Sequence, residues 1–219
     1  MSTSLRRTAA APVGETVHEV SVSPHYVRVW DAFVRIFHWS AVALVILLVL
    51  TAQYGVEDVH MALGVDLLAL VAARLAWGVI GTMHARFAEF VVAPKASLRY
   101  LGEVLRGRPR RHLGHNPAGG WMVIALLVAL SVALVSGLLL QAMLEFEGPL
   151  AGLLLSASDV FVDSVREVHR GSVHALYGLV PLHVIGVLLA SAQHRENLTW
   201  SMVTGYKRLH NEGQEECTS

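Results

Sequence analysis

Residues 166–192 read REVHRGSVHALYGLVPLHVIGVLLASA, an apolar stretch that carries His169 and His183 fourteen positions apart. In an α-helix, fourteen steps of about 100° return to within about 40° of the starting direction and climb about 21 Å. The two imidazoles therefore share one helix face at two depths. Ionisable side chains are costly inside a membrane span and usually mark function there. We predict that both histidines are ligands; the alternative is a pair of core histidines that bond to neighbouring helices.

The composition is that of an integral membrane protein. Of the 219 residues, 54% are hydrophobic and 16% are charged, and the mean hydropathy is +0.51. Basic and acidic residues number 17 each, which gives no sign of nucleic-acid binding. The single cysteine, Cys217, excludes a disulfide framework, a thiolate-bound iron–sulfur cluster and covalent attachment of a c-type haem. The 12 histidines are then the side chains left to bind iron.

Three further apolar segments are long enough to cross a bilayer. They run from Val34 to Tyr54, from His60 to Ile80 and from Trp121 to Gln141. With the stretch quoted above they predict an all-α membrane protein with four transmembrane helices. The third segment has no ionisable residue, so it supplies no ligand. Residues 145–164 are expected to form a connection too long for a hairpin, in which residues 150–155 are too few to span and lie on the surface.

The long polar section between the second and third spans contains SLRYLGEVLRG at residues 97–107. Its apolar side chains recur at helical spacing beside arginines, which predicts an interfacial amphipathic helix.

The distribution of basic residues orients the spans, because cytoplasmic loops carry an excess of Lys and Arg. Fourteen of the 17 basic residues precede span one, lie between spans two and three or follow span four, all on one side. The opposite side has only Arg166 and Arg170, against seven acids: Glu57, Asp58, Glu145, Glu147, Asp159, Asp163 and Glu167. We therefore expect a plasma (inner) membrane protein with both termini in the cytoplasm.

This orientation places four histidines in level-matched pairs. His38 near the start of span one lies at the inner level with His183, and His60 near the start of span two lies at the outer level with His169. Each pair can clamp one flat haem between facing helices, and two axial imidazoles leave no open position on the iron, which suits electron transfer. Zinc would require three or four converging ligands. We predict two bis-histidine b haems.

Other residues near these histidines are candidates for contact with the cofactor. Gly64 and Gly186 would leave room for a flat ring, although small residues also serve ordinary helix packing in membranes. Arg74 follows His60 by fourteen residues, so it lies at the inner level and can pair with a haem propionate. The alternative is that Arg74 extends to the cytoplasmic interface. Arg35 at the mouth of span one is a further polar candidate.

Several segments, taken in order, resemble the bacterial cytochrome b561 family, which is related to the b-type cytochrome subunit of nickel–iron hydrogenases. They are VWDAFVRIFHW (29–39), RLAWGVIG (74–81), ARFAEFV (85–91), LGHNPAGGWMV (113–123), EVH (167–169) with a second histidine fourteen residues on, and ENLTWSMVTGYKR (196–208). The resemblance implies a four-helix membrane cytochrome with two b haems and ligands in spans one, two and four. It carries over to the four histidines already chosen. The expected organisation is a polar tail at 1–27, a di-haem domain at 28–208 and a polar tail at 209–219.

The resemblance also implies a function, the transfer of electrons between the quinone pool and a periplasmic partner. LGHNPAGG and ENLTWSMVTG are similar to the branch that works with a soluble c-type cytochrome. One alternative is a quinone-linked oxidoreductase whose outer haem reacts with a small species such as superoxide, and another is the b-type subunit of a hydrogenase-like complex. A haem-free structural anchor would show no Soret absorption. His115 lies in a cytosolic loop and is given no iron, and Pro181 is expected to bend span four.

Overall fold

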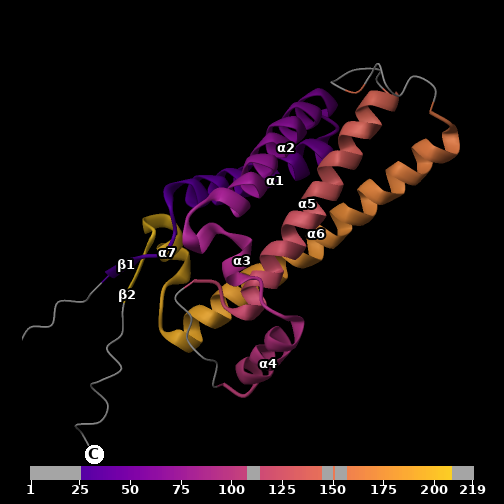
Figure 1. Cartoon of the computed structure of the whole chain (residues 1–219). Coiled ribbons are helices and arrows are strands. Elements are labelled where there is room, and N and C mark those ends of the chain that lie inside the picture. The colour runs from indigo at the N-terminus through magenta and orange to yellow at the C-terminus, as the bar shows by residue number, and fades with distance from the viewer. Residues whose placement is uncertain (1–25, 108–113, 145–149, 151–156, 209–219) are drawn as a thin grey trace, which may run out of the picture.

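The structure is a computed structural model of the chain, and it describes residues 26–107, 114–144, 150 and 157–208. Four long helices dominate this part: α1 (Ala32–Tyr54), α2 (Glu57–Ile80), α5 (Pro117–Leu144) and α6 (Asp159–His194) (Figure 1). Each is long and apolar enough to cross a membrane. The prediction of a mostly helical protein with four helices of spanning length is therefore confirmed.

The start of α6 corrects the expected connection between the third and fourth spans. The helix begins at Asp159, where the Ser158 hydroxyl accepts a hydrogen bond from the Phe161 amide, so residues 159–164 are helical and not part of a loop. A side-chain cap of this kind satisfies an amide that would otherwise lack a partner. α6 then continues through Pro181 to His194, and Arg195 ends it in a left-handed conformation (φ 50°).

The helices pack in the order α1, α2, α5, α6. The central helix α5 lies against both α2 and α6, and α1 lies against α2 (Figure 1). The buried cluster of Ala41, Leu67, Val71 and Leu127 joins α1, α2 and α5. By contrast, only 6% of the most apolar 18-residue stretch of α6 is buried. This helix therefore offers a long apolar surface to other groups.

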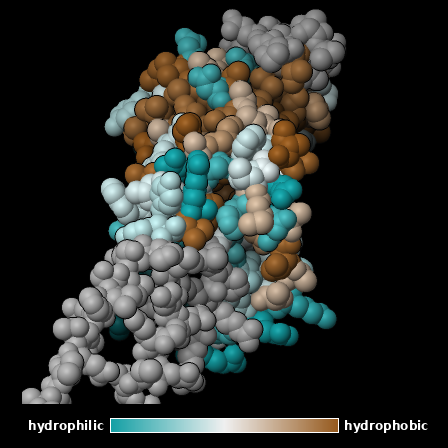
Figure 2. All heavy atoms as spheres, turned by 60° about the vertical axis from the view of Figure 1, so that its left-hand side comes forward, coloured by the Kyte–Doolittle hydropathy of each residue, from teal (hydrophilic) through white to brown (hydrophobic). Residues whose placement is uncertain are grey.

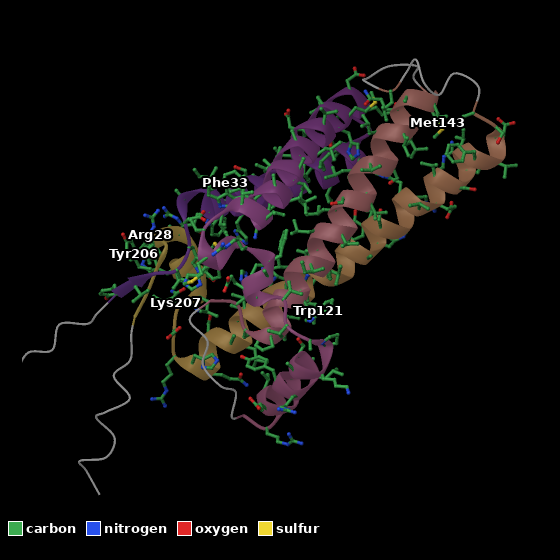
Figure 3. The ribbon with its side chains drawn as sticks, in the orientation of Figure 1. Arg28, Phe33, Trp121, Met143, Tyr206 and Lys207 are labelled. Atoms are coloured by element: carbon green, nitrogen blue, oxygen red, sulfur yellow. The ribbon has the colours of Figure 1, made fainter. Side chains whose placement is uncertain are left out.

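The first and the last residues that the structure describes lie side by side at one end of the bundle. There β1 (Tyr26–Arg28) pairs with β2 (Tyr206–Arg208) as an antiparallel ladder in which Tyr26 faces Arg208. Figure 3 shows Arg28, Tyr206 and Lys207 at this end and Met143 near the opposite end. We call it the β-end. The described residues also contain four short helices. Three lie between α2 and α5, namely η1 (Met83–Ala85), α3 (Phe87–Phe90) and α4 (Pro94–Leu105), and one, α7 (Leu198–Thr204), follows α6.

The surface changes in character along the bundle. Figure 2 shows hydrophobic residues gathered over the upper part of one face, with hydrophilic residues gathered below them toward the β-end. This division suits a protein whose spanning part meets lipid and whose end meets water.

Most of the segment at residues 97–107 lies in α4 (Pro94–Leu105), which begins at Pro94, a residue whose fixed φ suits the first turn. Its place at a membrane interface stays a prediction. The Ser97 hydroxyl donates to the Pro117 carbonyl (2.8 Å), and Tyr100 is buried. Leu98 and Leu101 point outward, 69% and 45% exposed. Outside the described residues lie most of both predicted tails, the basic residues Arg108, Arg110 and Arg111, and the acids Glu145 and Glu147.

Candidate functional site

The rings of His38 in α1 and His183 in α6 lie close together at the level of the β-end. Their ring centres are 6.5 Å apart, with an angle of 54° between the planes. A bond from a metal to an imidazole nitrogen is about 2.0 Å long and the ring centre lies about 1.2 Å behind that nitrogen, so two imidazoles on opposite sides of one ion have centres about 6.4 Å apart. The ring centres of the inner pair therefore lie at a separation compatible with one shared ion, and their role as ligands stays a prediction.

The start of α1, which carries His38, is fixed by Asp31. One carboxylate oxygen caps the helix by accepting from the Val34 amide (2.7 Å), and the other accepts from the Trp77 indole (3.0 Å) and the Thr82 hydroxyl (2.5 Å). Partial burial would raise the pKa of this carboxyl, but the three hydrogen bonds and the positive charge of Arg74 outweigh it and lower the pKa. The ionised carboxylate thus ties the start of α1 to the end of α2.

His60 in α2 is held against the far half of α1. Its Nδ1 lies 3.0 Å from the Leu48 carbonyl oxygen and 3.2 Å from the Thr51 hydroxyl. Because a carbonyl only accepts, Nδ1 is the donor in this contact, which would leave Nε2 as the nitrogen that can bind a metal. Leu48 and Thr51 follow His38 along α1 by a rise of about 15–20 Å, so His60 occupies a second level.

His169 in α6 is held in the same way by α5. Its Nδ1 lies 2.8 Å from the Ala133 carbonyl oxygen and 3.3 Å from the Ser136 hydroxyl, which again leaves Nε2 free. Gly137 gives the ring room, since a Cβ there would lie 3.1 Å from its Cε1. Sequence reasoning missed this contribution of α5. The adjacent small residues Ser136 and Gly137, within a run of Leu and Val, were the available signal.

The structure thus brings the inner pair together, whereas no ring contact joins His60 and His169 in the part of the chain that it describes. The pairing of the outer histidines stays a prediction. No group of three or more His, Cys, Asp or Glu side chains gathers among the described residues. His174 is exposed and contacts Tyr177, with ring centres 6.3 Å apart.

The glycines beside the predicted ligands have open flanks. A Cβ added at Gly64, Gly171, Gly178 or Gly186 would meet no atom within 4 Å. α1 and α6 are also not among the closely packed helix pairs of the described residues, although two of their histidine rings approach each other. This arrangement would suit a flat group held by His38 and His183, because such a group needs both space between helices and bare helix surface.

Arg74 is buried, with 3% of its surface exposed. One NH2 hydrogen bond reaches the Ala85 carbonyl (3.2 Å), and the guanidinium lies over the Phe87 ring (5.1 Å). Its NH1 is buried without an acceptor among the described residues. Arg35 similarly donates from NH1 to the Val203 carbonyl (2.6 Å) while its Nε is left without an acceptor there. Both arginines keep a donor available for an acidic group.

His115, which the sequence interpretation left without a role, lies at the same end. Its ring contacts those of Trp30 (4.7 Å between centres) and Phe90 (4.5 Å), and its Nδ1 is buried with no partner among the described residues. Burial, assisted by the positive charge of Arg74, lowers the pKa of His115 to about 3. The ring is therefore neutral near pH 7. The HNP sequence ahead of a glycine pair was the signal for a special position.

The family model of prokaryotic cytochrome b561 matches residues 29–205, which include all four predicted ligands. One curated relative, a "Probable Ni/Fe-hydrogenase B-type cytochrome subunit" from Rhodobacter capsulatus, is 22% identical over 214 residues, covering 83% of this chain and 81% of the relative. A protein of the same name from Bradyrhizobium diazoefficiens is 23% identical over 235 residues, covering 91% and 93%. No solved structure matches the chain.

Proposed function

Because the chain belongs to the prokaryotic cytochrome b561 family, it is a membrane b-type cytochrome of electron transport, and we propose that it holds two bis-histidine b haems. The inner haem would be bound by His38 and His183, and the outer haem by His60 and His169. The ring separation of 6.5 Å in the inner pair is the observation that carries this proposal. A bound haem supplies one-electron chemistry at its iron.

The protein's own residues would orient and enclose these cofactors. Hydrogen bonds from Nδ1 to the carbonyls of Leu48 and Ala133 fix the tautomer and the direction of the two outer rings. Arg74 and Arg35 present donors at the inner level, where acidic groups of a haem would lie. Gly64 and Gly186 keep the helix surfaces beside the ligands free of bulk.

We further propose that electrons pass between the quinone pool and a periplasmic partner, a soluble c-type cytochrome. The supporting features are the two ligand levels and the acidic residues at the end opposite the β-end. The proposed placement puts the β-end and both chain termini in the cytoplasm and the protein in the inner membrane. Residues 28–208 would form the di-haem domain between two polar tails, with α4 lying at the membrane interface.

A second function is favoured by the comparisons. Both relatives are named as b-type cytochrome subunits of Ni/Fe hydrogenases, so the partner of this chain would then be a hydrogenase-like complex. Co-purification of a tagged protein from its native membrane distinguishes the two partners. A c-type cytochrome recovered at low ionic strength supports the first, and a nickel-containing complex supports the second.

The two-haem proposal is tested by pyridine haemochrome stoichiometry and reduced-minus-oxidised spectra of the purified protein. We expect two b haems per chain. His183→Ala should remove the inner haem and His60→Ala the outer one, each leaving the other haem in place. His174→Ala is the matched control and should retain both. One haem or none in the unaltered protein would contradict the proposal.

A further inference from the structure

The β-end contains three buried nitrogens that have no hydrogen-bond partner among the described residues: Nε of Arg35 and NH1 of Arg74, which are donors, and Nδ1 of His115, which donates in one tautomer of the neutral ring. Such groups are rare, because an unsatisfied buried donor costs free energy. Three of them at one end of the molecule indicate that a shared acceptor binds there. The predicted ligand His38 accounts for the one other buried atom of this kind in the described part of the chain.

Continuous contacts link His115 to both arginines. The Arg74 guanidinium lies over Phe87, Phe87 contacts Phe90 (5.8 Å between ring centres), and Phe90 contacts His115. On its other side His115 contacts Trp30. The amide of Trp30 donates to the carbonyl of Gly205, and a Cβ at Gly205 would lie 3.4 Å from Nε of Arg35. The three groups thus belong to one connected set of contacts at the β-end.

The charges around His115 specify the kind of acceptor. The charged or titratable groups that act on it are Arg74, Lys207, His183 and His84, none of which is an acid. Asp31, the acid that interacts electrostatically with Arg74, already accepts hydrogen bonds at both oxygens. A region with surplus positive charge and spare donors favours a carboxylate over a neutral carbonyl. Since His183 is also among these neighbours, the carboxylate belongs at the inner ligand pair.

We propose that Nδ1 of His115 donates a hydrogen bond to a propionate carboxylate of the inner haem, alongside NH1 of Arg74. This inference rests on the proposed inner haem. It makes His115 a positioning residue that acts on the iron through the charge of the propionate. The packing of its ring between Trp30 and Phe90 directs the donor, and the neutral ring adds no charge of its own.

The test uses the full-length protein and the midpoint potential of the inner haem, measured by spectroelectrochemical titration in the His60→Ala background. His115→Phe keeps an aromatic ring between Trp30 and Phe90 and removes the donor. The unshielded carboxylate then favours ferric iron, so the reduction constant should fall by about tenfold, which is 59 mV for one electron. His115→Asn, whose amide can replace Nδ1, should restore most of the potential. His174→Phe is the control and should change nothing.

A second arm identifies the acceptor. Reconstitution of the full-length polypeptide with the dimethyl ester of haem removes the carboxylate charge, and His115→Phe should then leave the potential unchanged. An effect of the same size with the ester would show that another acceptor, such as a quinone carbonyl or a free anion, binds His115. That result would overturn the proposal, as would an unchanged potential in His115→Phe or equal shifts in the Phe and Asn variants. An unaltered protein without an inner haem would instead refute the proposed function before any His115 variant is made.

Discussion

Gly137 of α5 faces the ring of His169 of α6 so closely that a Cβ at position 137 would lie 3.1 Å from Cε1 of the imidazole. Helix α5 supplies no predicted ligand, yet it shapes the space that holds the ring of the predicted ligand His169. A backbone carbonyl and a hydroxyl from the same helix bind the Nδ1 of this ring. These contacts all come from about one turn of α5, Ala133 to Gly137, so they depend on α5 keeping its register against α6.

Gly137→Val should displace the His169 ring and weaken the outer haem, because the β-branched side chain overpacks a site that has no free space. Overpacking of this kind costs about 1–3 kcal/mol. Gly137→Ala should have a smaller effect, since the ring can shift by a few tenths of an ångström. Haem stoichiometry and the spectrum of each level measure the result. Loss of the inner haem with retention of the outer one would contradict the assignment of His169 to the outer level.

Ser136→Ala should weaken the outer haem slightly, because its hydroxyl lies 3.3 Å from Nδ1 of His169 and the Ala133 carbonyl remains in place. The expected cost is about 0.5–1.5 kcal/mol. Ser131→Ala is a matched control, since the Ser131 hydroxyl also bonds to a carbonyl four residues back in α5 and has no bond to a histidine. Haem retention during dilution compares the two. Equal losses would mean that the serine acts through the helix alone.

Asp31→Asn should lower thermal stability, because the amide cannot accept from the Val34 amide, the Trp77 indole and the Thr82 hydroxyl together. Loss of a helix cap costs about 0.5–2 kcal/mol, and the two side-chain bonds add to it. Ser158→Ala, which removes the longer 3.4 Å cap of α6, should cost less. Melting followed by circular dichroism in detergent measures both. A larger loss for Ser158→Ala would contradict the role given to Asp31.

The Asp31→Asn variant also tests how the stabilising contribution of Asp31 depends on pH. The folded-state pKa of Asp31 is lowered, so its stabilising contribution is complete above the unfolded value of about 3.9 and disappears as pH falls through the folded pKa. The difference in melting temperature between the unaltered protein and Asp31→Asn should therefore be constant from pH 8 to about pH 5 and shrink below about pH 4. A difference that grows in acid would refute the assignment.

Binding of a basic cytochrome c should weaken as ionic strength rises, because exposed charges are screened by salt. At the end opposite the β-end, Arg166 and Arg170 are paired with Asp163 and Glu167 of their own helix. Glu57 and Asp58 at the start of α2 then add negative charge. The double variant Glu57→Lys, Asp58→Lys should slow reduction of the cytochrome at low salt. Glu89→Lys near the β-end is the control, and salt-independent kinetics would contradict steering.

Leu98 of α4 should contact lipid, because it is exposed beside the basic residues Lys95 and Arg99 on a helix whose opposite side packs on α5. A spin label at Leu98→Cys in a Cys217→Ser background should be more accessible to oxygen than to a water-soluble nickel chelate. A label at Glu103→Cys should show the reverse. Equal accessibility at both positions would place α4 in water.

The sequence by itself determined the number of helices of spanning length, and it predicts which histidines share a face. Both follow from local rules: about twenty apolar residues cross a bilayer, and a spacing of fourteen returns an α-helix to nearly the same direction. The ends of the helices were harder to predict from the sequence. α6 begins at Asp159 because of a cap by Ser158, and capping adds a turn that hydropathy does not register.

Only the tertiary structure decided which groups form hydrogen bonds with those histidines. That His60 bonds to Leu48, and His169 to Ala133 beside Gly137, depends on the rotation and register of packed helices. The meeting of His115 with Trp30 and Phe90 joins three segments distant in sequence. Backbone carbonyls are present at every residue, so no pattern of side chains indicates which one a histidine will use. That choice is made by the packing of one helix on another.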